Sequence, residues 1–232
     1  MDTLSNLKLI DLTHTIAPNI PCWNGPKSCG FQHEIKLDYT DGNRDPGFRV
    51  QQITMHAGIG THMDAPAHCV PGGDSIAELP LENFFAPCCV IDVSDRIHER
   101  YSLSVDDIRG FESQHGKLKE NTFVIVYTGW EKFWGTPERY HNNYTFPSVS
   151  EKAALILLER KIVGLGIDTF SPDRPEDGFP VHQHILGARK YIIENIANTR
   201  LLPPTGAYTL ALPIKTFEGT EAPTRLVGLV QC

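Results

Sequence analysis

The sequence predicts an α/β domain, and three observations support this fold class. Short apolar runs that fit buried strands alternate with amphipathic stretches in the second half of the chain. The chain has 232 residues, which suits one large domain, and neither an internal repeat nor a linker-like segment divides it. Hydrophobic residues make up 41% and charged residues 21%, as in a globular protein with a buried core. We therefore expect a single domain over residues 1–232.

The first half of the chain is expected to consist mainly of strands and loops. Lys8–Leu12 is the first strand candidate, and the three prolines of Ala17–Gly30 predict a loop. Phe48–Met55 combines β-branched residues with alternation, which is typical of a strand. A glycine-rich turn follows it, and Val90–Val93 is a further short apolar strand.

Two helices are predicted with their starting residues. Ser104–His115 begins with a serine that can cap it and has two aspartates in its first turn. Ser150–Arg160 also begins with a capping serine and carries an apolar stripe of alanines and leucines. The remaining elements are one short helix, at Val181–Arg189, and strands at Thr122–Tyr127, Val163–Ile167, Tyr191–Glu194, Tyr208–Leu212 and Arg225–Val230.

Charge and hydropathy limit the classes of partner. The formal net charge is -7 with no block of like charges, which argues against nucleic acid or an anionic membrane as the main partner. No apolar run is long enough to span a bilayer, and the N-terminus lacks the pattern of a signal peptide. The six cysteines form no C-x-x-C pair, so free thiols and a cytoplasmic location are expected.

The most informative local pattern is G-T-H-M-D-A-P-A-H at residues 60–68. In an extended strand, residues two apart face the same side, so His62 and Asp64 present an imidazole and a carboxylate together. Such a pair suits a borderline divalent cation such as Zn²⁺ or Mn²⁺. Pro66 should end the strand and turn the chain, which would place His68 beside the cation. The H-x-D pattern is short, and taken alone it better fits a hydrogen-bonded histidine and an aspartate that caps a turn.

A second cluster strengthens the metal interpretation. His182 lies in V-H-Q-H, and Glu194 follows twelve residues later within the apolar run Y-I-I-E-N. A buried carboxylate is costly unless it is paired or bound to a metal. Taken alone, Glu194 also fits a surface residue at the end of a strand.

These motifs together resemble the cyclase-like metal-dependent hydrolase family, which includes bacterial kynurenine formamidases and isatin hydrolases. The similarity runs nearly from end to end of the chain. It covers Asp11–His14, residues 60–68, Tyr127–Trp130, Gly166–Thr169 with Ser171, His182–Gly187, and Glu194–Asn195.

The resemblance implies a swivelling β/β/α-type fold with a mixed sheet, a homodimer or homotetramer, and a small-molecule substrate. It also implies metal binding by His62, Asp64, His182 and Glu194, with Asp64 able to bridge two ions, and a catalytic role for His68. Zn²⁺ is the expected ion and Mn²⁺ the alternative. The implied reaction is hydrolysis of an amide or lactam, of the arylformamidase type, by a metal-activated water.

The chain departs from this family at position 58. Two-metal members carry a histidine four residues before the second one, where this chain has Gly58. His56 is the nearest histidine, and only a bulge in the glycine-rich turn could bring it to the site. His56 is therefore a candidate ligand, and both one-ion and two-ion centres remain open.

Two further expectations concern the substrate and an alternative function. Trp23, in the proline-rich loop, is a weak candidate to stack on a flat aryl substrate, and packing in the interior explains it equally well. The loss of a histidine at Gly58 also fits a non-catalytic metal-binding protein that acts as a sensor or scaffold. His68 favours the enzyme, because metal binding alone does not need it.

Overall fold

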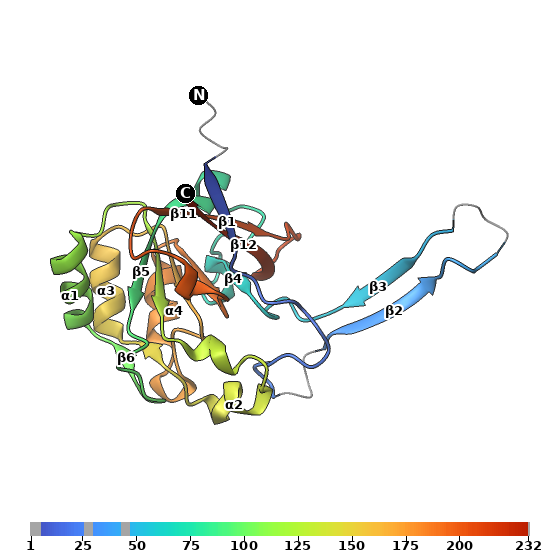
Figure 1. Cartoon of the computed structure of the whole chain (residues 1–232), viewed down its shortest axis with the longest axis horizontal. Coiled ribbons are helices and arrows are strands. Elements are labelled where there is room, and N and C mark those ends of the chain that lie inside the picture. Colours follow the sequence, from blue (N-terminus) through green and yellow to red (C-terminus); the bar gives the residue numbers. More distant parts are fainter. Residues whose placement is uncertain (1–5, 26–29, 43–46, 232) are drawn as a thin grey trace.

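The computed structural model describes residues 6–25, 30–42 and 47–231, and a mixed eight-stranded sheet forms its centre (Figure 1). The strands in spatial order are β1 (Leu7–Asp11), β12 (Glu221–Gln231), β11 (Ala207–Pro213), β5 (Phe85–Asp92), β7 (Phe123–Tyr127), β9 (Gly164–Ile167), β10 (Tyr191–Glu194) and β4 (His62–Asp64). β4 also pairs with β12, so the seven strands from β12 to β4 form a closed, barrel-like ring. The predicted mixed α/β architecture is confirmed, and the ring closure is a feature that the sequence pattern did not predict.

The parallel strands are the most deeply buried. β5, β7, β9 and β10 run parallel, whereas the other pairings of this sheet are antiparallel. Along β7, Phe123 and Ile125 belong to the core on one face, and Val124 and Val126 belong to the core on the other. Both faces of a strand in a parallel sheet are covered, which explains its continuous apolar sequence.

Helices cover the face of the sheet to which Val124 and Val126 contribute. They are α1 (Val105–His115), α3 (Glu151–Glu159) and α4 (Pro180–Gly187), whereas α2 (Pro137–His141) contributes Tyr140 to a separate aromatic cluster. α1 packs against α3 and α3 against α4, as Figure 1 shows for the first pair. The short 3-10 helices are η1 (Pro66–His68), η2 (Leu81–Phe84), η3 (Trp130–Phe133), η4 (Asn142–Tyr144), η5 (Pro175–Asp177) and η6 (Thr199–Leu201).

The predicted helix starts are confirmed at both serines. Ser104 caps α1 and forms a reciprocal capping box with Asp107, and the Ser150 side chain accepts a hydrogen bond from the Ala153 amide at the start of α3. Each cap satisfies amides that have no partner within the helix. None of the helices in the described part of the chain has the length and apolarity of a bilayer span.

A two-stranded arm extends away from the main body (Figure 1). It consists of β2 (Gln32–Leu37) and β3 (Val50–Thr54), which pair with each other in a sheet of their own. β3 falls within the predicted strand Phe48–Met55, but it does not join the main sheet. Its alternating pattern therefore does not mark a core face, and every residue of β3 is exposed. β6 (Ser102–Leu103) and β8 (Ser148–Val149) form a second small pairing.

The cysteines correct one expectation. Cys22 is disulfide-bonded, whereas Cys69, Cys88 and Cys89 are free thiols. The prediction of free thiols holds only for the three other cysteines that the structure describes.

Candidate metal centre and active site

The three-residue strand β4 brings the two halves of the candidate site together. His62 lies opposite Glu194 of β10, and Asp64 lies opposite Glu221 of β12. Directly opposed residues of paired strands point to the same face, so one face of β4 carries the polar side chains. Met63 points to the other face and is fully buried in the core inside the ring. The sheet thus joins residues that are more than a hundred positions apart in sequence.

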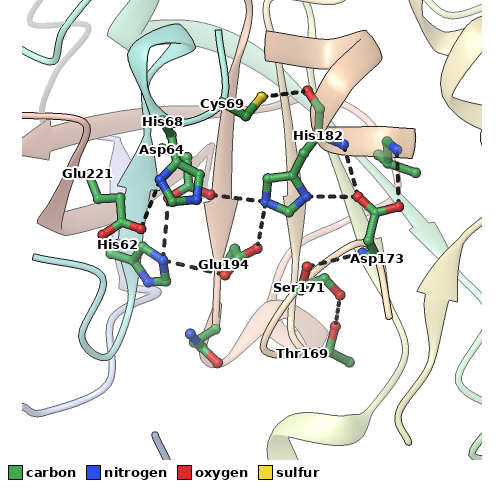
Figure 2. A network of polar contacts seen from close by, with 12 residues as sticks. His62, Asp64, His68, Cys69, Thr169, Ser171, Asp173, His182, Glu194 and Glu221 are labelled. Atoms are coloured by element: carbon green, nitrogen blue, oxygen red, sulfur yellow. Dashed lines mark hydrogen bonds and ion pairs between the residues drawn. The ribbon is translucent and has the colours of Figure 1, made fainter. Parts of the chain in front are cut away.

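His62, Asp64, His182 and Glu194, which we call the four-residue cluster, face one another (Figure 2). His62 Nε2 lies 3.4 Å from Asp64 Oδ1 and 3.4 Å from Glu194 Oε2. His182 Nε2 lies 3.6 Å from Asp64 Oδ2 and 3.4 Å from Glu194 Oε1. Ligand atoms of His62, Asp64 and Glu194 lie within 4.8 Å of one another, and His182 contacts the other oxygen of each carboxylate. The four side chains therefore offer imidazole and carboxylate ligands to a shared cation.

The electrostatics of the four-residue cluster also require positive charge. Asp64 is 1% exposed, and neither of its carboxylate oxygens has a hydrogen-bond partner. Burial lowers the pKa of His62, but Asp64 and Glu194 outweigh it and raise the pKa to about 10. The pKa of His182 is likewise raised well above its ordinary value by Asp173, Asp64 and Glu194, against the effect of burial. Without a cation the carboxylates hold protons on the imidazoles, and a divalent cation would replace those protons.

Hydrogen bonds at the far nitrogen orient both imidazoles. Nδ1 of His62 lies 2.9 Å from the Gly60 carbonyl oxygen, which can only accept, so Nδ1 carries the proton. Nδ1 of His182 lies 2.8 Å from Asp173 Oδ2. Each Nε2 therefore faces the cluster with a free lone pair when the ring is neutral, which is the arrangement that metal ligation requires.

Asp173 is a functional residue that the sequence interpretation missed. It is 1% exposed, and it also accepts hydrogen bonds from the amides of Val181 and His182 at the start of α4. One carboxylate thus holds the helix start and the metal-facing imidazole together. In the sequence, the feature that could have indicated this role is an aspartate seven residues before Pro180, the first residue of α4.

His68 and Glu221 form a second group beside the four-residue cluster. The chain turns at Pro66 into η1, as predicted, and this turn places His68 next to the cluster. Nδ1 of His68 lies 3.0 Å from Glu221 Oε1, and its ring centroid lies 5.9 Å from that of His182. The hydrogen bond to Glu221 raises the pKa of His68 by more than burial lowers it. Ligand atoms of Asp64, His68 and Glu221 also lie within 4.8 Å of one another.

Positions 56 and 58 contribute no ligand to either group. His56 lines the same cavity, but it is exposed and belongs to neither set of candidate ligands among the described residues. Its ring lies so close to Gly30 that a Cβ there would be 2.8 Å from His56 Cδ2. The space next to Gly58 is taken by the Glu221 carboxylate.

A cavity of about 550 Å³ opens onto both groups. Its walls include Trp23, Phe170 and Phe179, and Trp23 packs against the other two with ring centroids 6.2 Å apart in each case. Among the described residues that line the cavity, none is a lysine or an arginine. The cavity wall therefore combines aromatic rings with the carboxylates of the site.

A buried polar network supports the floor of the site. Asn195 donates to the Gly60 carbonyl, and the single proton of the Tyr140 hydroxyl is shared between Asn195 Oδ1 and the Asp168 carbonyl, each 2.9 Å away. The Asp168 carboxylate accepts from the amide and hydroxyl of Thr128. Complete burial raises the pKa of Asp168 to about 6. Thr128, Asp168 and Asn195 directly follow the carboxyl ends of β7, β9 and β10, where ligands commonly bind in parallel sheets.

The chain matches a known protein family and several of its members. The family model described as "Putative cyclase" matches residues 10–174. Isatin hydrolase from Roseibium aggregatum is 28% identical over 97% of this chain and 92% of its own length. Kynurenine formamidase from Erythrobacter litoralis is 24% identical over 96% of this chain and 94% of its own length.

Solved structures of the same kind superimpose over nearly the whole chain. Isatin hydrolase A from Ralstonia solanacearum has a TM-score of 0.89 and 30% identity, covering 98% of this chain and 94% of its own. An isatin hydrolase bound to the product analogue thioisatinate has a TM-score of 0.88 and 28% identity, with 99% and 94% covered. A protein described as a potential metal-dependent hydrolase with cyclase activity has a TM-score of 0.77 and 26% identity, with 97% and 99% covered.

Proposed function

This chain belongs to the putative cyclase family and is a metal-dependent hydrolase of amide bonds, and we propose that the four-residue cluster and His68 carry out the reaction. The single observation that carries the proposal is the ring of four contacts of 3.4–3.6 Å between two imidazoles and two buried carboxylates. A non-catalytic sensor or scaffold has no comparable support, since the named relatives are enzymes.

The donor set fits a divalent cation. Two imidazole nitrogens and two carboxylates suit Zn²⁺ and Mn²⁺ alike, and we propose Zn²⁺ as the ion. When bound, such an ion lowers the pKa of a coordinated water toward about 7 and polarises a substrate carbonyl. The orphaned oxygens of Asp64 are the observation that most directly calls for an ion.

His68 is proposed as the group that moves protons. It lies at the cavity wall, outside the four-residue cluster, so its ring is free of the two-carboxylate contacts that hold His62 and His182. There it can accept a proton from the attacking water and deliver it to the leaving nitrogen. The aromatic wall around Trp23 would hold a planar aryl group over the reacting centre.

The cavity favours a neutral substrate. Its described lining has no lysine or arginine to pair with a carboxylate, and Glu221 adds negative charge at the wall. We therefore propose a neutral aryl-fused lactam, as the names of the isatin hydrolases suggest, rather than an amino acid derivative. The catalytic efficiency for isatin should exceed that for N-formylkynurenine by at least tenfold. Equal or better turnover of N-formylkynurenine would refute this assignment of substrate.

Two histidines of α4 provide the central test. His182→Ala should lose both the bound metal and hydrolysis, because it removes one of the four ligands. His184 lies on the same helix and pairs with Glu151 on the exposed side, so His184→Ala should retain both. Metal analysis together with turnover of isatin checks the expectation. A His182→Ala protein with normal metal content would exclude this centre.

The arm is proposed to hold subunits together in a homo-oligomer. It exposes large apolar side chains, namely Ile35, Tyr39, Phe48, Val50 and Ile53. Apolar surface of this kind commonly marks a contact with another chain. Light scattering after gel filtration should give a mass of at least two chains, and a monomer would contradict the proposal. The cytoplasmic location and the swivelling fold type stay predictions.

A further inference from the structure

We propose that Glu221 is a positioning residue for His68, and that glycine is needed at position 58 because this carboxylate fills the space beside it. The inference rests on the proposed function, since it assigns His68 a partner within the same reaction. It adds a residue that neither the motif analysis nor the family resemblance had given a role.

The side chains of His68 and Glu221 are in direct contact. Nδ1 of His68 lies 3.0 Å from Glu221 Oε1, a normal hydrogen-bond distance. A carboxylate accepts, so Nδ1 must carry the proton, and in the neutral ring Nε2 is then the basic nitrogen. Figure 2 shows the His68 ring between Glu221 and His182. The two ring nitrogens diverge, so the basic nitrogen points away from Glu221, on the side of the cluster.

Strand pairing fixes the backbone of Glu221. It is the first residue of β12 and lies directly opposite Asp64 of β4. The Ala65 amide donates to the Thr220 carbonyl at 2.9 Å, which continues the pairing past the strand. The sheet therefore fixes the Glu221 backbone relative to the cluster, and the side chain needs to span only the distance to η1. Side chains of Glu221 and His68 are 23% and 34% exposed, so the pair lies at the cavity wall.

The Glu221 carboxylate occupies the space beside Gly58 that a side chain would otherwise take. A Cβ at this position would lie 2.9 Å from Glu221 Oε2 and 3.1 Å from Glu221 Cδ. The backbone of Gly58 is not in the left-handed region, so a side chain there would meet no backbone strain but would have to displace the Glu221 carboxylate. A glycine here leaves room for the carboxylate in the position that meets His68. This residue therefore serves the Glu221–His68 pair without touching His68.

The same geometry predicts what Glu221 does in catalysis. A base whose second nitrogen is held by a carboxylate keeps one tautomer and one ring orientation, as in other nucleophile–base–carboxylate arrangements. Loss of the carboxylate lets the ring rotate and lets the proton move to the other nitrogen. The chemical step should slow, whereas substrate binding and metal binding should change little.

Two independent variants test the proposal. Glu221→Gln removes the charge, and Gly58→Ala keeps both partners but pushes the carboxylate away from Nδ1. Each should lower kcat for isatin by about 10- to 100-fold, as for loss of an outer hydrogen-bond partner, with KM within twofold of the wild type. Gly187→Ala is the matched control, because a Cβ at that position meets nothing within 4 Å. Its kcat should equal that of the wild type.

Two readouts separate this proposal from the alternatives. Nitrogen NMR of the protein with labelled histidine should show His68 protonated at Nδ1 in the wild type and a mixture of tautomers in both variants. This readout requires no substrate. Ions bound per chain should be the same in all proteins. If Glu221→Gln loses an ion, Glu221 is a ligand of a second site with Asp64 and His68, and the proposal is overturned. Unchanged kcat and tautomer in both variants would overturn it equally.

Discussion

The contact between Asp173 and His182 allows a quantitative test of the metal centre by the substitution Asp173→Asn. The carboxylate accepts three hydrogen bonds, from the Val181 amide at 3.0 Å, the His182 amide at 2.9 Å and His182 Nδ1 at 2.8 Å. An asparagine of the same shape has only one accepting oxygen. Whichever way the amide is turned, its NH₂ group faces at least one of these donors.

The expected cost follows from the tautomer of His182. If the amide NH₂ faces Nδ1, that nitrogen must accept, and the proton moves to Nε2, where a cation would bind. If the amide oxygen faces Nδ1 instead, the amide of Val181 loses its acceptor at the start of α4. Outer partners of this kind typically contribute about 10- to 100-fold to metal affinity. We therefore expect the free energy of metal binding to weaken by about 1.4–2.7 kcal/mol.

The assay is a competition titration of zinc between the protein and a coloured chelator. Glu151→Gln is a matched control, because Glu151 forms the same kind of contact with His184, at 2.9 Å, on the exposed side of α4. The control should bind zinc as the wild type does. If Asp173→Asn also retained wild-type affinity, the orientation of His182 by Asp173 would have no role in metal binding, and the reasoning from tautomers would be wrong.

Three other predictions follow from the same structure. Chelation should abolish hydrolysis and lower the melting temperature by about 5–10 °C, and both should recover when zinc is added. The reason is that an ion whose free concentration is about a hundred times its dissociation constant stabilises the folded protein by about 2.7 kcal/mol. Glu194→Gln should lower zinc affinity by more than the roughly 100-fold limit of an outer partner, in the same competition titration. Burial raises the pKa of Asp168 from 3.8 to about 6. The folded state therefore favours the protonated carboxyl, and this contribution to stability is fully present below pH 3.8 and is lost as the pH rises through 6. Urea unfolding should therefore show the wild type losing roughly 3 kcal/mol relative to Asp168→Asn over that interval, and parallel pH profiles would contradict it.

Much of the local structure could be predicted from the sequence because it depends on neighbours in the chain. The serine caps of α1 and α3 are set within three residues, and the buried runs of β7, β9 and β10 are recognisable from composition alone. The placement of His62 and Asp64 on one face followed from the period of a strand. These features need no knowledge of what packs against them.

The partners of the site could not be predicted, because they depend on long-range pairing. Glu221 stands near the end of the chain, and only the register of β12 with β4 places it opposite Asp64. Asp173 lies in a loop, and its role depends on the direction in which α4 begins. The strand β3 was predicted from its alternating pattern, but its place in an exposed arm depends on its pairing with β2 alone, which the pattern does not give.

The pairing of β4 on both edges explains why so short a strand can carry the site. A three-residue strand has few hydrogen bonds of its own, but β10 and β12 together fix its position from both sides. Cross-strand neighbours are about 4.5–5.5 Å apart at Cβ, so the flanking carboxylates reach the same volume as the side chains of β4. Met63 on the opposite face is fully buried and anchors the strand to the core inside the ring. Closure of the ring is thus what preorganises the ligands, and a change that opened the β4–β12 edge should displace Glu221 from His68 before it disturbs Glu194, which is held by β10.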